Sequence, residues 1–165
     1  SRFTLYVLFF QGEVDNVTDQ VQREVVLIIP MYPNMELAAA QTASVLAELM
    51  NFEENHIDEI QFAIIETCIN AFEHSQSDDQ RVFIKFIMRD DALELKITDR
   101  GVGFRLDAVK TSHIEKAIDG NMRKRGWGLE IIRSMMDEVN VESGEEGTTI
   151  TMIKKKMRSK QKDEV

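Results

Sequence analysis

Residues 92–104 read ALELKITDRGVGF and contain the most informative pattern in this chain of 165 residues. Apolar and polar side chains alternate through residues 93–97, which predicts a strand with one face in a core. Asp99 continues the alternate positions that the apolar residues occupy, so a carboxylate reaches the core side where the strand ends. Gly101 and Gly103 then allow the backbone to approach a ligand closely. A carboxylate at such a loop suits the exocyclic amine of adenine, although Asp-x-Gly-x-Gly is also compatible with an ordinary turn.

The segments on either side of this strand predict the fold class. Helical patterns alternate with pairs of strands joined by short turns, which favours an α+β fold: a two-layer α/β sandwich whose mostly antiparallel mixed sheet packs on helices. Asn34 is the predicted N-cap of the first helix. Strands are predicted at residues 24–29, 82–88, 92–98, 139–143 and 148–153, and helices at 34–50, 57–74 and 128–138.

Composition limits the classes of partner. The chain is 43% hydrophobic and 30% charged, which is typical of a globular domain, and its net charge is −9. An acidic surface argues against nucleic acid as a direct partner. No apolar run approaches the roughly 20 residues of a membrane span. The single cysteine, Cys68, fits a reducing, cytoplasmic compartment.

The charge distribution and the apolar pattern predict three parts. Residues 1–22 form an extension, either an extra edge strand or a remnant of an expression tag. Residues 23–156 form the folded domain. Residues 154–165 contain six basic and two acidic side chains, so this segment carries +4 and the rest of the chain −13. We therefore interpret the KKKMRSKQK stretch that begins at Lys154 as solvated, and residues 157–165 as a basic flexible tail.

The helix predicted at residues 57–74 is apolar on most of its circumference but carries one polar stripe. Glu66, Asn70, Glu73 and His74 recur at helical spacing and stack along one side. A buried carboxylate is costly unless it is paired, hydrated or used in chemistry. The stripe therefore indicates either a functional surface or a side of the helix that faces solvent.

A third pattern lies in residues 124–139, KRGWGLEIIRSMMDEV. Gly126 and Gly128 stand where a helix begins, so free backbone N–H groups and the positive helix end can face an anion. Lys124 and Arg125 add positive charge in an otherwise acidic chain. Phosphate is the natural ligand, although a capped helix with a solvated basic turn has the same pattern.

The order of these motifs is more specific than any one of them. Glu-x-x-x-Asn on a helix, Asp-x-Gly-x-Gly-Phe after a strand and Gly-x-Gly-Leu at a helix start resemble the GHKL, or Bergerat, ATP-binding fold of the histidine kinase-like ATPases. Within that superfamily the chain is similar to the anti-sigma-factor serine/threonine-protein kinases, through DRGVGF, RGWGLEIIRSMMDEVNVES and GTT before the last strand. The resemblance covers nearly all of residues 24–156.

The resemblance implies roles for individual residues. Glu66 corresponds to the catalytic carboxylate, which takes the proton of an attacking hydroxyl group. Asn70 corresponds to the Mg²⁺ ligand, and Asp99 to the residue that reads adenine. The other implied nucleotide-binding residues are Gly101, Gly103, Lys124, Arg125, Gly126, Gly128, Leu129 and Thr148.

The function implied by the resemblance is that of an ATP- and Mg²⁺-dependent serine/threonine protein kinase in the cytoplasm. Its substrate would be a small anti-sigma-factor antagonist protein, its regulated target a sigma factor or similar protein, and its assembly a homodimer that contacts neither nucleic acid nor membrane. The alternative is an ATP-bound protein-interaction switch without phosphotransfer, controlling a phosphatase or other regulator. The catalytic half of a histidine kinase is less favoured, because the sequence lacks a separate helical hairpin bearing a phosphoacceptor histidine.

Overall fold

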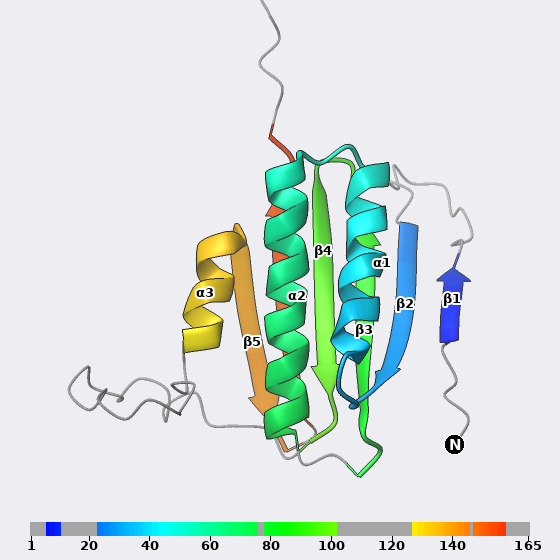
Figure 1. Ribbon diagram of the computed structural model, residues 1–165, viewed down its shortest axis with the longest axis vertical. Helices are drawn as coiled ribbons and strands as arrows, with labels where there is room; N and C mark the ends of the chain where they lie inside the picture. Colours follow the sequence, from blue (N-terminus) through cyan, green and yellow to red (C-terminus); the bar gives the residue numbers. More distant parts are fainter. Residues whose placement is uncertain (1–5, 11–22, 76–77, 102–126, 146, 158–165) are drawn as a thin grey trace, which may run out of the picture.

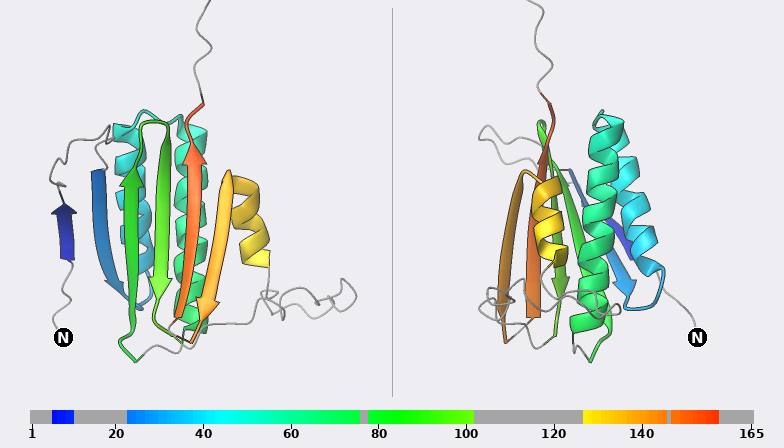
Figure 2. Two further views of the ribbon diagram at one scale, coloured as in Figure 1. Left: turned by 180° about the vertical axis from the view of Figure 1, so that it is seen from behind. Right: turned by 60° about the vertical axis from the view of Figure 1, so that its left-hand side comes forward.

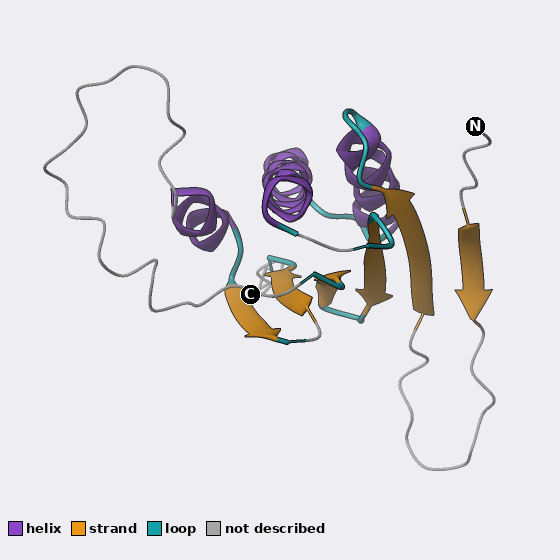
Figure 3. Cartoon of the chain, turned by 90° about the horizontal axis from the view of Figure 1, so that it is seen from below, coloured by secondary structure: helices purple, strands orange, loops and turns teal. Residues whose placement is uncertain are grey.

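The predicted two-layer α+β architecture is present in the structure. The computed structural model describes residues 6–10, 23–75, 78–101, 127–145 and 147–157. Within these ranges, helices lie on one face of a single sheet, as Figure 3 shows end-on. The elements are β1 (Tyr6–Phe10), β2 (Arg23–Pro30), α1 (Met35–Leu49), α2 (Glu54–His74), β3 (Arg81–Met88), β4 (Ala92–Asp99), α3 (Trp127–Met135), β5 (Glu138–Gly144) and β6 (Gly147–Lys155).

The described strands form one six-stranded sheet in the order β1-β2-β3-β4-β6-β5. Every neighbouring pair is antiparallel, so the part of the sheet that the structure describes is more regular than the mixed sheet predicted. β1 pairs with β2 at the sheet edge. Of the two interpretations of the N-terminal extension, this pairing agrees with the extra edge strand. Hairpins join β3 to β4 and β5 to β6, because short turns suffice between antiparallel neighbours.

Element boundaries differ from the prediction mainly at the helices. α2 begins at Glu54, about one turn earlier than predicted. α3 ends at Met135 because Glu138 already belongs to β5. Asn34 does precede α1, but the predicted side-chain cap is wrong: its φ is 71° and its side chain makes no cap hydrogen bond. Asparagine tolerates this left-handed backbone, and the Asn34 carbonyl accepts a hydrogen bond of 3.3 Å from the Leu37 N–H.

The core lies between the sheet and its layer of helices. In Figure 1 the helices stand in front of the strands, and the view from behind in Figure 2 shows that none of the described helices lies on the other face of the sheet. We call these the covered face and the open face. The alternation predicted for β4 is confirmed, since Leu93, Leu95 and Ile97 are buried on the covered face. None of the helices in the described ranges is long and apolar enough to cross a membrane.

One lysine of the basic stretch is not solvated as predicted. Lys154 begins that stretch, but β6 continues to Lys155 and its alternation turns Lys154 toward the covered face. Lys154 is therefore buried, while Lys155 is exposed. Residues 158–165, most of the predicted tail, lie outside the described part of the chain.

Candidate functional site

The polar stripe of α2 runs from the core toward solvent. The face predicted to be apolar is the one that the structure buries, and Glu66 is buried beside it with 9% of its surface exposed. Asn70, one turn further along, is half-buried, and Glu73 and His74 are exposed. The stripe thus places a carboxylate and a carboxamide at the boundary of the core. The buried apolar face consists of Ile60, Ala63, Ile64, Thr67, Cys68 and Ala71.

The start of α3 lies directly against these two side chains. A Cβ atom built on Gly128 would stand 2.5 Å from Glu66 Oε1 and 2.9 Å from Asn70 Nδ2. Both distances are shorter than van der Waals contact, so a side chain at this position would have to displace Glu66, Asn70 or the helix itself. Gly128 therefore permits a close approach between the first turn of α3 and the polar stripe. Leu129 follows it in a half-buried position.

The end of β4 holds the second polar group. Asp99 is buried on the covered face, and its Oδ1 accepts a hydrogen bond of 2.9 Å from the backbone N–H of Gly101. This local bond fixes the orientation of the carboxylate as the chain leaves the strand. The prediction that Asp99 reaches the core side is confirmed, because it continues the buried set of β4.

Thr148 stands beside Asp99 in the neighbouring strand. The two residues are paired in the β4–β6 register, and Thr148 is buried. Its hydroxyl group shares a hydrogen bond of 2.9 Å with that of Ser143 on β5. Thr148 therefore lies next to the predicted adenine-reading carboxylate, in a position that three strands define.

Gly147 packs against the backbone of Asp99, and sequence reasoning did not single it out. Its φ is 126°, and a Cβ atom at this position would collide with the backbone carbonyl of Asp99. Only glycine combines this backbone angle with so close an approach. The available signal was the glycine in the GTT sequence before the last strand, since glycine at a strand start often marks a close backbone contact.

The elements that carry the two polar groups reach the same end of the molecule. In Figure 1 the end of β4, the C-terminal half of α2 and the start of α3 all point toward the lower end of the view. Thr67, one residue after Glu66, connects α2 to the sheet because its hydroxyl lies 3.6 Å from Met152 Sδ on β6. The covered face of the sheet and α2 thus carry Asp99 and Glu66 on one rigid framework.

The chemistry of the groups around Gly128 suits a hard cation bound together with an anionic ligand. Carboxylate and carboxamide oxygens are the ligands that Mg²⁺ prefers, and Mg²⁺ commonly keeps waters and phosphate oxygens as further ligands. In the described ranges no group of three or more histidine, cysteine, aspartate or glutamate residues could hold a metal ion by itself. The oxygen atoms of Glu66 and Asn70 are of the type that fits such a cation.

Two other polar side chains in the core, Cys68 and His56, have surroundings typical of a structural role. Burial raises the pKa of the Cys68 thiol to about 12, and the charge of Glu36 adds to the shift, so the thiol is protonated at neutral pH. His56 is buried and packs edge-on against the Phe52 ring, with ring centroids 6.4 Å apart.

Four predicted nucleotide-binding residues lie outside the described residues. They are Gly103, Lys124, Arg125 and Gly126. Their roles remain predictions from the sequence.

Known proteins with similar sequences are named as ATPases or kinases. The family described as "Histidine kinase-like ATPase domain" matches residues 32–154. Serine-protein kinase RsbW of Oceanobacillus iheyensis is 30% identical over 132 residues, which are 76% of this chain and 82% of the relative. Serine-protein kinase RsbW of Bacillus velezensis is 28% identical over 131 residues, with 76% and 81% covered.

One solved structure extends the likeness to three dimensions. The RsbU and RsbW domains of a Mycobacterium tuberculosis protein match with a TM-score of 0.60 and 19% sequence identity. The match covers 81% of this chain and 33% of that longer one. At this level of identity the match shows a shared fold, which agrees with the two-layer architecture described above.

Proposed function

Because this chain belongs to the histidine kinase-like ATPase domain family, we propose that it is a regulator of the anti-sigma-factor type that phosphorylates a small antagonist protein. It is a protein serine kinase, like its relatives named serine-protein kinase RsbW, and it uses ATP. In this proposal the unphosphorylated antagonist and a sigma factor, or a similar target, compete for the kinase. Phosphorylation of a serine on the antagonist then leaves the kinase available for its target.

The observation that carries the proposal is the close approach of Gly128 to Glu66 and Asn70. The first turn of α3 presents backbone N–H groups that have no partner within the helix, and the positive end of its dipole lies nearby. A carboxylate alone would be a poor neighbour for a phosphate, but a carboxamide, a helix start and a cation together can hold one. The arrangement therefore supports a γ-phosphate bound at the start of α3, beside its contact with α2.

Glu66 is the proposed base of the transfer step. Its carboxylate accepts the proton of the substrate serine hydroxyl while that oxygen forms a bond to the γ-phosphorus. The bond between the γ-phosphorus and the oxygen bridging to the β-phosphate breaks, and ADP leaves with that electron pair. Because phosphoryl transfer depends mainly on positioning and charge neutralisation, the fixed framework of α2 and α3 is the main contribution of the protein.

The nucleotide base is proposed to lie at the end of β4. The Asp99 carboxylate, held by the Gly101 N–H, would accept a hydrogen bond from the exocyclic amine of adenine. Thr148 is adjacent in the register and would contact the same end of the nucleotide. Guanine carries a carbonyl where adenine carries the amine, so this site discriminates against GTP.

Asn70 is the proposed protein ligand of Mg²⁺. Its side-chain oxygen would hold the ion, which when bound neutralises part of the charge on the phosphates. Lys124, Arg125 and Gly126 are proposed to contact the phosphates, and Gly103 the nucleotide base, on the basis of the sequence motifs. The protein is further proposed to act in the cytoplasm as a homodimer.

The test is transfer of labelled γ-phosphate to an antagonist-type protein encoded near this one, scored for phosphoserine. Glu66→Gln keeps the size of the side chain and removes the base, so it should bind ATP normally and lose about 10²–10⁴ in transfer rate. Glu73→Gln is the matched control, because Glu73 lies on the same stripe but is exposed, about two turns from Glu66. This variant should retain both ATP binding and transfer.

Two results would overturn parts of the proposal. Equal transfer rates in Glu66→Gln and wild type would remove Glu66 as the base. Tight ATP binding without labelling of any candidate would instead indicate that the protein is an ATP-bound switch. The fold and the family would stand in both cases, because they do not depend on the transfer step.

A further inference from the structure

Lys154 forms a contact that joins three elements on the covered face. Only 7% of its surface is exposed. Its Nζ atom lies 2.6 Å from Glu59 Oε2 on α2 and donates a hydrogen bond of 2.7 Å to the backbone carbonyl of Met135, the last residue of α3. One ammonium group on β6 thus connects α2 with the C-terminal end of α3.

The chemistry of this contact is specific to a cation. A buried ammonium group is costly unless charge and hydrogen bonds compensate it, and here Glu59 supplies the charge. The last carbonyl groups of a helix have no partner within the helix and carry its negative dipole end, which a lysine stabilises. An apolar side chain could fill the same space but could neither donate to Met135 nor attract Glu59.

The contacts of α2 with α3 and with Lys154 are equally far apart along both helices. α2 and α3 run in opposite directions in Figure 1, α2 downward and α3 upward. Glu59 precedes Glu66 by about two turns of α2, and Met135 follows Gly128 by about two turns of α3. α3 is therefore attached to α2 at both ends, by Lys154 at one and by the contact of Gly128 with Glu66 at the other.

We propose that Lys154 is a positioning residue that sets how closely Gly128 approaches Glu66 and Asn70. The ammonium group fixes the far end of α3, and the rigid helix carries this constraint to its first turn. Ile132 lies between the two ends of α3 and is fully buried, so it holds the middle of the helix in the core. The inference rests on the proposed function, because the residues around Gly128 are those assigned there to phosphate binding and transfer.

The test compares Lys154→Met with Lys155→Met in binding of ATP with Mg²⁺, measured by calorimetry, and in phosphate transfer. Lys155 is the neighbouring residue and forms an ion pair of 2.7 Å with Glu138, but both side chains are exposed and neither is on α2 or α3. Lys154→Met should raise the Kd for ATP roughly tenfold, the factor typical of one charge-assisted hydrogen bond. Lys155→Met should bind ATP as wild type does.

Glu59→Gln separates the two contacts of Lys154. It removes the opposite charge but leaves the hydrogen bond to Met135, so the Kd should rise less than in Lys154→Met, by roughly threefold. If Lys154→Met does not fold, Glu59→Gln carries the test in its place. An unchanged Kd in the folded variant would then overturn the inference.

Hydrogen exchange provides a readout that general destabilisation would not produce. In Lys154→Met, backbone amides of residues 129–136 should exchange faster while those of β3 keep their wild-type rates. Faster exchange throughout the domain with an unchanged Kd for ATP would mean that Lys154 only stabilises the fold, and would overturn the inference. Failure of wild type to bind ATP would refute the proposed function instead, and the exchange of α3 would still report on the contact of Lys154.

Discussion

Lys154 and Lys155 are neighbours in β6, and their ion pairs differ in length by only 0.1 Å, at 2.6 Å to Glu59 and 2.7 Å to Glu138. The first lysine side chain is 9% exposed and the second 55%. An exposed pair in water contributes little to stability, whereas a buried ammonium group needs its partners. The two ion pairs, on opposite faces of one strand, therefore differ in how much stability is lost when one partner is removed.

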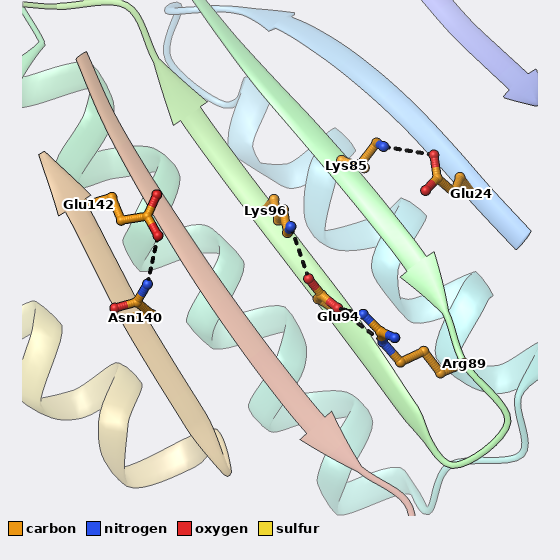
Figure 4. A network of polar contacts seen from close by, with 7 residues as sticks. All are labelled: Glu24, Lys85, Arg89, Glu94, Lys96, Asn140 and Glu142. Atoms are coloured by element: carbon orange, nitrogen blue, oxygen red, sulfur yellow. Dashed lines mark hydrogen bonds and ion pairs between the residues drawn. The ribbon is translucent and has the colours of Figure 1, made fainter. Parts of the chain in front are cut away.

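The same contrast holds across the sheet. Figure 4 looks onto the open face, where Lys85 pairs with Glu24 at 2.8 Å and Asn140 donates a hydrogen bond of 3.0 Å to Glu142. These pairs connect side chains that water also reaches. On the covered face, by contrast, Glu66 and Asp99 lie where the helices meet the sheet, and the backbone at Gly128 and Gly147 packs closely against these residues. Glu94 on the open face is also buried, so the candidate site is distinguished by its place between the helices and the sheet and not by burial alone.

The largest effect is expected from Asp99 and its neighbour Thr98, which face opposite sides of β4. Asp99→Asn should weaken ATP binding by about 1.5–3 kcal/mol, because the adenine amine loses a charged acceptor. Thr98→Val removes only a hydrogen bond of 2.9 Å to Thr149 on the open face, so ATP affinity should not change. Calorimetry with ATP and GTP measures both, and equal ATP affinity in Asp99→Asn and wild type would refute the adenine assignment.

A somewhat smaller effect is expected in the β5–β6 hairpin. Gly147→Ala should lower the free energy of unfolding by about 1–3 kcal/mol, since alanine is strained at a φ of 126° and its Cβ would collide with the Asp99 carbonyl. Gly144→Ala, across the turn, places its Cβ in open space and should change stability by less than about 0.5 kcal/mol. Urea unfolding of both variants tests this. Similar stabilities would show that the hairpin can relax away from Asp99.

The smallest effect is expected at Glu94, the centre of the open-face network. Burial would raise the pKa of its carboxyl, but hydrogen bonds and charge from Arg89 and Lys96 outweigh burial and lower it. The ionised group therefore stabilises the fold at neutral pH. This contribution is fully present above the ordinary pKa of glutamate, about 4.3, and is lost as pH falls through the lower folded pKa.

Glu94→Gln should accordingly be less stable than wild type by about 0.2–1 kcal/mol at pH 7, since Arg89 and Lys96 are partly exposed to solvent. The difference should shrink as pH falls below the ordinary pKa of glutamate and through the lower folded pKa, where the wild-type carboxyl group becomes protonated. Urea unfolding between pH 3 and 7 measures it. A difference that stays constant over this range would mean that packing, and not charge, accounts for the contribution of Glu94.

Much of the fold was predictable because it depends on local periodicity. The alternation in β4 predicted that Asp99 would lie on the same face as Leu95, and the structure buries both. The helical pattern of α2 predicted which face would enter the core and where the polar stripe would lie. The order of the three motifs predicted the family, which the family match and the relatives confirm.

Other features could not be predicted, because they depend on which elements meet. The charge count treated Lys154 as part of a solvated segment, since a run of basic residues usually faces water. Sequence reasoning did not single out Gly147, although its backbone approaches Asp99 on a neighbouring strand. In both cases the decisive partner is remote in the sequence.

The sequence by itself determined the chemistry of this protein: an acidic group at a strand end, a polar stripe on a buried helix and a glycine at a helix start. Only the tertiary structure decided that Gly128 lies against Glu66, and that Lys154 links α2 to the end of α3. The physical reason is that backbone periodicity determines the direction of each side chain within its own element. Contacts between elements depend instead on how whole faces pack, which no local pattern contains.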